Sequence, residues 1–383
     1  MSVTAPQGFR AAGVAAGLKP SGRKDVALVV NDGPLHHAAA VFTSNRVVAA
    51  PVTWSRQVVG DARVDAVVLN SGGANACTGP RGFADTHATA EHAAERLGIS
   101  SGDVLVCSTG LIGEFLPMER LLDGVSAAAK ELAAEGGPLA AEAIMTTDTV
   151  SKQALVQRDG WSVGGMAKGA GMLAPALATM LVVLTTDAVV EPSALDTALR
   201  EASALTFDRV DSDGCQSTND TVVVLASGAS GTSPDPRAFT DALTEVCADL
   251  ARQLITDAEG AQHDIEVEVG SAATVEDALE VARSIARNNL VKCAVFGGDP
   301  NWGRVLAAVG TTSAAFAPEA LDVTMNGIPV CRGGSVGQDR SLVDLSGRHV
   351  HLLVDLHAGE QGATVWTNDL THDYVHENSA YSS

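Results

Sequence analysis

Short valine-rich runs recur along the chain, each bounded by glycine, asparagine or aspartate, and this pattern is typical of β-strands. The run Met180–Leu184 is apolar throughout, as in a strand covered on both faces, whereas Ile265–Val269 alternates apolar and charged residues, as in a half-solvated strand. The predicted strands are Asp25–Val30, Ala66–Asn70, Asp103–Ser108, Met180–Leu184, Thr221–Ala226, Ile265–Val269, Val291–Phe296 and Val350–Leu356.

Apolar residues at helical spacing predict helices between these strands. They fall in Glu119–Glu135, in Thr274–Arg287, and in the segment where Phe239, Leu243, Val246, Leu250 and Leu254 repeat. Because helices and strands mix along the whole length, we expect an α/β or α+β fold in which helices cover sheets. A chain of 383 residues is too long for one simple core and suits two domains or one large layered unit.

The composition narrows the class of partner. Hydrophobic residues make up 46% of the chain and aromatic residues 4%, which is typical of a globular protein. The net charge of −21 argues against nucleic acid and against anionic membranes as partners. No run reaches the roughly 18 apolar residues that a membrane helix needs, and the first residues lack the apolar core of a signal peptide. We therefore expect a cytoplasmic protein.

Cysteine and histidine positions give no sign of a metal or cofactor. The cysteines lie far apart without a CxxC motif, so we expect reduced, mostly buried thiols. The histidines show no HExxH motif, and the glycine-rich stretches LNSGGANACTG (Leu69–Gly79) and GGDPNWGR (Gly297–Arg304) match no nucleotide fingerprint. Neither a metal nor a nucleotide cofactor is expected. The cysteines are Cys77, Cys107, Cys215, Cys247, Cys293 and Cys331.

The stretch KGAGMLAPALATMLVVL (Lys168–Leu184) places a threonine where a Gly/Pro-rich loop becomes an apolar strand. The simpler interpretation is that β-branched Thr179 merely begins a strand. The functional one is that the bond between Ala178 and Thr179 is cut. The freed α-amine, with an ordinary pKa of about 7.7–8, would then serve as base for the neighbouring hydroxyl. The residues alone leave both interpretations open and favour the simpler one.

Several motifs, taken together, favour cleavage before Thr179 over the simpler interpretation. The chain closely resembles, over essentially its whole length, the ornithine acetyltransferase family, the bifunctional glutamate N-acetyltransferases of arginine biosynthesis. Besides KGAGMLAPALATML, the motifs are GFRAAGVAAGLK, AVFTSNRVVAAPV, LNSGGANACTG, CSTGLIGEFLPM, AIMTTDT, STNDT, GGDPNWGR and the tail YVHENSAYSS.

The resemblance implies self-cleavage between Ala178 and Thr179. An α chain (1–178) and a β chain (179–383) would stay associated in a layered α/β/β/α sandwich, commonly paired as an α2β2 heterotetramer. It also implies a ping-pong reaction in which N-acetylornithine acetylates Thr179 and glutamate then takes the acetyl group. Some members also accept acetyl-CoA as the donor, and no cofactor is implied.

The resemblance also assigns site residues. Thr109 and Gly110 match the oxyanion hole, and Lys168 and Glu259 match groups expected to meet a substrate carboxylate and ammonium. Thr147 matches a substrate-binding threonine, with Thr146 as the near alternative. The full set of predicted substrate contacts is Thr147, Lys168, Thr179, Glu259, Asn378 and Ser383.

Two departures from the family pattern bear on these assignments. Many relatives read GEGATK where Ala258–His263 reads AEGAQH, so the Thr-Lys pair after the glutamate is lost and a histidine is present. Asp213–Thr221 carries Cys215-Gln where relatives often have Asp-Thr, and we interpret that cysteine as incidental.

Two other functions fit part of the pattern. One is an N-terminal-nucleophile amidohydrolase or aminopeptidase with the same processing, because only exclusion of water separates transfer from hydrolysis. The other is an uncleaved, non-catalytic amino-acid-binding protein.

Overall fold

The chain forms two compact units in a computed structural model that describes residues 2–174 and 180–380. Within these residues, unit 1 comprises 2–208 and 215–254, and unit 2 comprises 209–214 and 255–380. The junction between Ala178 and Thr179 therefore falls within the sequence span of unit 1. The boundary between the predicted α and β chains is not a boundary between units.

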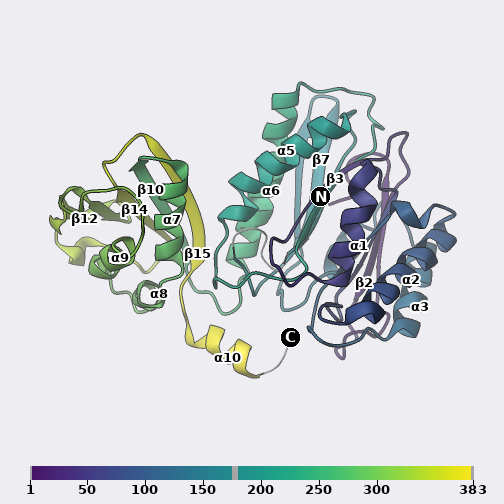
Figure 1. Cartoon of the computed structure of the whole chain (residues 1–383), viewed down its shortest axis with the longest axis horizontal. Coiled ribbons are helices and arrows are strands. Elements are labelled where there is room, and N and C mark those ends of the chain that lie inside the picture. Colours follow the sequence, from purple (N-terminus) through teal and green to yellow (C-terminus); the bar gives the residue numbers. More distant parts are fainter. Residues whose placement is uncertain (1, 175–179, 381–383) are drawn as a thin grey trace. The chain divides into compact units, whose positions relative to one another are not determined.

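Unit 1 contains two sheets (Figure 1). One has the order β1-β2-β4-β5, and the other β3-β9-β8-β7-β6, with β8 parallel to β9 and antiparallel to β7. The first sheet consists of β1 (Phe9–Val14), β2 (Val26–Asn31), β4 (Ala66–Asn70) and β5 (Val104–Ser108). The second consists of β3 (His37–Phe42), β9 (Thr221–Ala226), β8 (Leu181–Thr186), β7 (Trp161–Lys168) and β6 (Lys152–Arg158).

The two sheets of unit 1 pack face to face. Leu69 and Leu105 of the first sheet share a buried cluster with Leu181 and Val223 of the second. Helices α2 (Gly79–Leu97) and α3 (Met118–Lys130) cover the outer face of the first sheet, and α5 (Pro192–Leu205) and α6 (Pro236–Thr256) cover the second (Figure 1). The predicted α/β/β/α sandwich is thus the architecture of unit 1. The shorter helices are α1 (Ala50–Val58) and α4 (Gly137–Ala143).

Strand β8 is buried at every position, as its continuous apolar run predicts. The hydroxyls of its two buried threonines are both hydrogen-bonded: Thr185 donates to Val3 O at 2.6 Å and Thr186 to Ser162 O at 2.8 Å. Their burial therefore leaves no hydroxyl unsatisfied. The strand that follows the predicted cleavage position is therefore a central element of the core.

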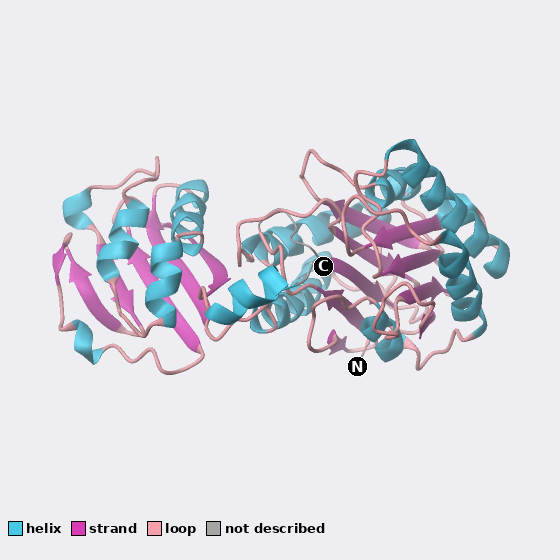
Figure 2. Cartoon of the chain, turned by 90° about the horizontal axis from the view of Figure 1, so that it is seen from below, coloured by secondary structure: helices cyan, strands magenta, loops and turns pink. Residues whose placement is uncertain are grey.

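Unit 2 is a six-stranded sheet with helices on one face (Figure 2). Strand β10 alternates between buried and part-exposed residues, as predicted for Ile265–Val269. The strand order is β13 (Ser335–Val336), β12 (Ile328–Arg332), β11 (Asp322–Met325), β14 (His349–Asp355), β10 (Asp264–Ala272) and β15 (Gln361–Asn368). The helices on this face are α7 (Val275–Ala286), α8 (Asn289–Phe296) and α9 (Trp302–Val309), whereas α10 (His372–Ala380) follows β15 and has no buried residue.

The prediction of a strand over Val291–Phe296 is wrong, because these residues belong to helix α8. The Asn288 side chain caps the helix by accepting hydrogen bonds from the N–H groups of Leu290 and Val291. Val291, Ala294 and Val295 then lie on one buried helical face. A short apolar run fits a buried strand and a buried helix equally well, and the cap decides between them.

The cysteine prediction is half right. None of the six cysteines, all within the described residues, forms a disulfide, but Cys77, Cys215 and Cys293 are exposed while the other three are buried. Within residues 2–174 and 180–380, no helix is both long enough and apolar enough to cross a membrane.

Candidate active site

The turn that follows β5 carries Thr109 and Gly110, the residues matched to the oxyanion hole. The Thr109 N–H donates to Asn70 O at 2.9 Å, and the Gly73 N–H donates to Thr109 O at 3.0 Å. The glycine-rich stretch after β4 thus fixes the turn, as the sequence suggests. Since the Thr109 N–H is already occupied, the donors that the described part of this turn could offer a ligand are the Thr109 hydroxyl and the Gly110 N–H.

Glycine is the only residue type that fits at position 110. Its φ is +128°, and a Cβ there would lie 2.7 Å from the nitrogen of Gly73. Any side chain would force the turn away from the stretch after β4. The close approach of these two backbones sets the position of the Gly110 N–H.

Lys168, at the end of β7, meets Thr109. The lysine is buried, with 1% of its surface exposed, and its Nζ donates to Thr109 Oγ1 at 3.3 Å. Two residues that the resemblance assigns to different roles are therefore in direct contact. Because the ammonium occupies an acceptor site of the hydroxyl, the hydroxyl proton is left to point towards another acceptor.

A buried carboxylate, Asp148, joins this end of β7 to the preceding loop. Its Oδ1 lies 2.6 Å from Lys152 Nζ and accepts the Gly169 N–H at 2.7 Å, while its Oδ2 accepts the Thr146 N–H at 2.9 Å. Thr147, the predicted substrate contact, is the half-buried residue between Thr146 and Asp148. One side chain thus holds the Thr147 loop and the residue after Lys168 together.

Positive charge gathers around Asp148. Burial acts to raise the pKa of its carboxyl, but the ammonium groups of Lys168 and Lys152 and the Gly169 N–H outweigh burial and lower that pKa to about 2. Lys19 also interacts with this group, and its own pKa is lowered to about 8 by burial and by the charge of Arg23. Lys152, Lys168, Lys19 and Arg23 outnumber the carboxylates that interact with them, Asp148, Asp25 and the buried Asp220, and a surplus of cations suits an anionic ligand.

Unit 2 brings together two further predicted residues. Asn378 Nδ2, on α10, donates to Glu259 Oε2 at 2.9 Å. In the same unit, His263 Nδ1 lies 2.7 Å from Oδ2 of the buried Asp369. The histidine that replaces the family's lysine therefore ties the Glu259 loop to the end of β15. The predicted residues Thr179 and Ser383, and Ala178 at the predicted cut, lie outside the described residues.

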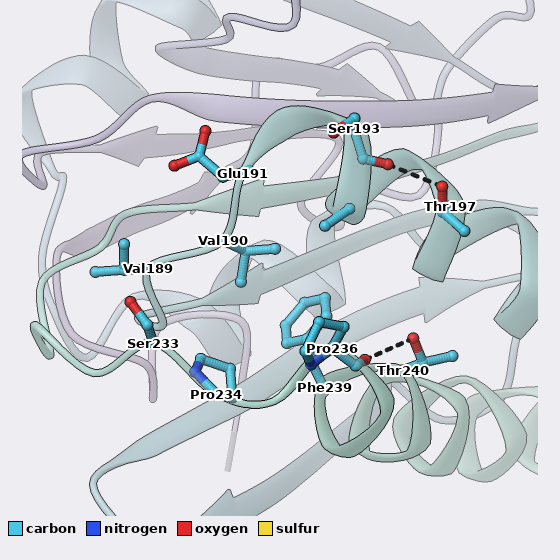
Figure 3. A pocket seen from close by; sticks show the side chains of 11 residues that line it. Val189, Val190, Glu191, Ser193, Thr197, Ser233, Pro234, Pro236, Phe239 and Thr240 are labelled. Carbon is cyan, nitrogen blue, oxygen red and sulfur yellow. Dashed lines mark hydrogen bonds between the residues drawn. The ribbon is translucent and has the colours of Figure 1, made fainter.

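A separate pocket of about 430 Å³ lies beside α5 and α6 in unit 1 (Figure 3). Its lining is largely apolar and includes Val190, Pro236 and Phe239. None of the predicted site residues lines it, so we do not assign the reaction there.

Comparisons with known proteins give the family. The model of the ArgJ family matches residues 10–383. The arginine biosynthesis bifunctional protein ArgJ of Streptomyces coelicolor is 66% identical over 383 residues, which is 100% of both chains. The chain belongs to the ArgJ family. The corresponding proteins of Thermobifida fusca and Bifidobacterium longum are 65% and 54% identical, again over 100% of both chains.

Solved structures from the ArgJ family are also similar in sequence. The ornithine acetyltransferase of Mycobacterium tuberculosis in complex with ornithine is 57% identical, with a TM-score of 0.45, and the match covers 47% of this chain and 96% of that one. The ArgJ protein of Bacillus halodurans is 37% identical, with a TM-score of 0.49, and the match covers 51% of this chain and 97% of that one.

Sequence reasoning missed two polar side chains around the turn of this ArgJ family member. Asp148 lies inside the motif AIMTTDT, in which only the threonines are predicted to contact substrate. Asn219, in STNDT, donates from Nδ2 to Ser108 O at 2.8 Å and to Ala74 O at 2.6 Å, and so braces both sides of the turn. The available signal was a charged or amide residue in a motif bordered by apolar strands.

The lowered pKa of Asp148 predicts a component of acid sensitivity. Ionised Asp148 stabilises the fold above its ordinary pKa of 3.8, and this stability is lost as the pH falls towards about 2, because the unfolded chain takes up the proton first. The effect is roughly 2 kcal/mol. About half of this effect is lost by pH 3, so urea unfolding at pH 6, 4 and 3 should show a decline that is about 1 kcal/mol larger in wild type than in Asp148→Asn.

At neutral pH, Asp148→Asn should itself destabilise the protein by roughly 3–5 kcal/mol, because it leaves buried Lys152 without its carboxylate. Asp196→Asn, which breaks a surface pair with Arg200, is the matched control and should have little effect. Equal unfolding midpoints for both variants at pH 6 would contradict a structural role for Asp148.

Proposed function

We propose that this chain transfers the acetyl group of N2-acetyl-L-ornithine to L-glutamate through an acetyl-Thr179 intermediate. As an ArgJ family member it is an acyltransferase of arginine biosynthesis that acts on small molecules. The observation that carries the proposed mechanism is the contact between Lys168 Nζ and Thr109 Oγ1, which prepares a hydroxyl donor in a buried, cationic turn.

The proposed chemistry uses the Thr179 hydroxyl as nucleophile and the α-amine released by cleavage as base. The amine takes the hydroxyl proton as the oxygen attacks the acetyl carbonyl. Collapse of the tetrahedral intermediate breaks the amide bond, and the leaving amine of ornithine takes that proton. The amine of glutamate then attacks the ester, and the Thr179 oxygen recovers a proton as N-acetylglutamate leaves.

The turn after β5 supplies the donors for the oxyanion formed in both halves of the reaction. The Thr109 hydroxyl and the Gly110 N–H are held before substrate arrives, so they need no rearrangement when negative charge develops. Lys168 aids this in two ways: it orients the Thr109 hydroxyl, and it adds positive charge nearby.

Charge also supports the assignment of the substrate ends. Lys168, Lys19 and Arg23 suit the carboxylate of ornithine or glutamate, since Arg23 Nη2 donates to Thr146 O beside the Thr147 loop. For the ammonium end, Glu259 is proposed on the family resemblance alone. No bound cofactor is needed, and acetyl-CoA would act only as an alternative donor.

Strand pairing supports lasting association of the two chains after cleavage. Strand β7 of the α chain pairs with β8 of the β chain from Lys168↔Leu181 to Val163↔Thr186, and β3 pairs with β9 in the same sheet. Separation would therefore open a sheet inside the core. We further propose an α2β2 assembly and a cytoplasmic location, on the family resemblance.

The reaction itself is tested with N-acetylornithine supplied with and without glutamate. We expect N-acetylglutamate to form in step with ornithine when glutamate is present, and only one equivalent of ornithine per site without it. Steady release of free acetate regardless of glutamate would instead identify a hydrolase. Acetyl-CoA offered in parallel reports whether a second donor is accepted.

Thr179→Ala should leave one uncut chain of 39.1 kDa without transferase activity, because both the attacking hydroxyl and the site of cleavage chemistry are lost. Denaturing electrophoresis and the assay above check this. Two fragments from the variant would refute the assignment of the nucleophile. One band from wild type that also lacks transferase activity would support the uncleaved, non-catalytic alternative.

Thr109→Val should lower kcat by about 10²–10³, because it keeps the shape of the side chain and removes an oxyanion donor. Thr109→Ser retains the hydroxyl and serves as the control, with kcat much closer to wild type. Self-cleavage should slow in the same order, since it passes through an oxyanion too. Equal rates for the two variants would rule out the hydroxyl as a donor.

A further inference from the structure

The segment between β1 and β2 lies against the glycine-rich stretch that fixes the oxyanion turn. Leu18 approaches Gly72 so closely that a Cβ at the glycine would lie 2.3 Å from Leu18 Cβ. The residue after this glycine, Gly73, donates its N–H to Thr109 O at 3.0 Å. The residue after Leu18 is Lys19, so the course of the chain brings this lysine close to the turn.

The same segment of unit 1 also meets the loop that carries the predicted substrate threonine. Arg23 Nη2 donates to Thr146 O at 3.4 Å. Lys19 lies near enough to Lys168 and Asp148 for their charges to act on its own, as does the charge of Arg23. Both cations of the segment therefore border the group of charges around Lys168.

One buried carboxylate holds the segment in this position. Asp25, just before β2, accepts the N–H groups of Ala16 and Leu18 at 2.6 Å each and that of Lys19 at 3.0 Å. Its backbone oxygen accepts the Ser71 N–H at 3.0 Å. The carboxylate is thus used by backbone donors, and it fixes the point from which the Lys19 side chain extends.

The ammonium group of Lys19 forms no ion pair with a carboxylate in the described part of the chain. The lysine is half-buried, and its Nζ donates to Lys24 O at 2.7 Å. Burial and the charge of Arg23 lower its pKa to about 8, so it is still mostly charged at pH 7. An ammonium has three donors, so among the described contacts two remain after the bond to Lys24. A half-buried cation of this kind suits an anionic ligand.

The chemistry of the two amino acids gives that anion an identity. Ornithine and glutamate share an α-carboxylate, but the ornithine side chain ends in an ammonium and the glutamate side chain in a second carboxylate. Lys168 contacts Thr109 at the oxyanion turn, so it suits the shared carboxylate close to the reacting atoms. Lys19 and Arg23 donate instead to backbone oxygens away from that turn, and they suit a charge further from those atoms.

We propose that Lys19, with Arg23 beside it, binds the side-chain carboxylate of glutamate and so selects the acceptor of the acetyl group. This rests on the proposed function, of which it names the acceptor subsite. A cation at this place disfavours the side-chain ammonium of ornithine, so the same group that attracts the acceptor helps to distinguish it from the product of the first half-reaction. No covalent bond to Lys19 forms or breaks.

Lys19→Met tests the charge, because methionine is nearly as long and is neutral. We expect KM for glutamate to rise about tenfold or more, since a charge-assisted bond is lost, while kcat changes much less. KM for N-acetylornithine should stay the same or fall, because a cation that opposes its side-chain ammonium is removed. Both constants come from the steady-state formation of N-acetylglutamate.

Lys19→Arg keeps the charge and should recover most of the affinity for glutamate. Lys24→Met is the matched control in the same segment: Lys24 pairs with Glu142 at 3.1 Å, so its loss should leave KM for glutamate unchanged. Arg23→Gln changes an exposed residue and should raise KM for glutamate by about threefold, which gives a second measure that does not alter a half-buried position. Melting temperatures of all four variants report on folding.

The outcomes separate the proposed function from the role of Lys19. Wild type that forms no N-acetylglutamate contradicts the proposed function. Active wild type together with a Lys19→Met variant whose KM for glutamate is unchanged overturns the acceptor subsite. An equal rise of KM for both substrates overturns it as well, because that result fits a general disturbance of the site. If Lys19→Met does not fold, an unchanged KM for glutamate in Arg23→Gln decides against the proposal.

Discussion

The burial of Asp148 is the constraint on which the candidate site in unit 1 depends. A carboxylate removed from water is tolerated only when charges and donors surround it, and here they come from Lys152, Lys168 and the N–H groups of Thr146 and Gly169. These groups belong to separate segments, so the requirement to satisfy one charge brings the Thr147 loop and the end of β7 together. Lys168 is then aligned with Thr109.

A second polar group has the same effect at the start of β9. Asn219 braces the turn after β5, and Asp220 holds the first described residue of the segment that enters β8. Because β8 pairs with β7 on one side and β9 on the other, a cut before Met180 would leave both ends anchored in one sheet. The core thus permits loss of a peptide bond while it keeps the neighbouring donors in place.

Much of the fold could be predicted because its strands are apolar and sharply bounded. Ala66–Asn70 and Thr221–Ala226 are predicted to the residue, whereas Val291–Phe296 is a helix whose cap the apolar run conceals. The family motifs identified Thr109, Lys168, Glu259 and Asn378 as candidate site residues. Nothing local indicates that Lys168 meets Thr109, or that Asn378 meets Glu259 across 119 positions. Asp148 and Asn219 lie in polar motifs that read as solvated turns, and only the packing of distant strands reveals that they are buried.

The central claim is that a threonine released by cleavage carries the acetyl group between substrates. Its most direct test is the intact mass of the active protein, quenched in acid after exposure to N-acetylornithine alone. Acetyl transfer through Thr179 predicts two chains, of which the one beginning at Thr179 has gained the mass of a single acetyl group and returns to its original mass when glutamate is added. An intact chain of 383 residues in fully active material, or a β chain that never gains an acetyl group, would contradict it.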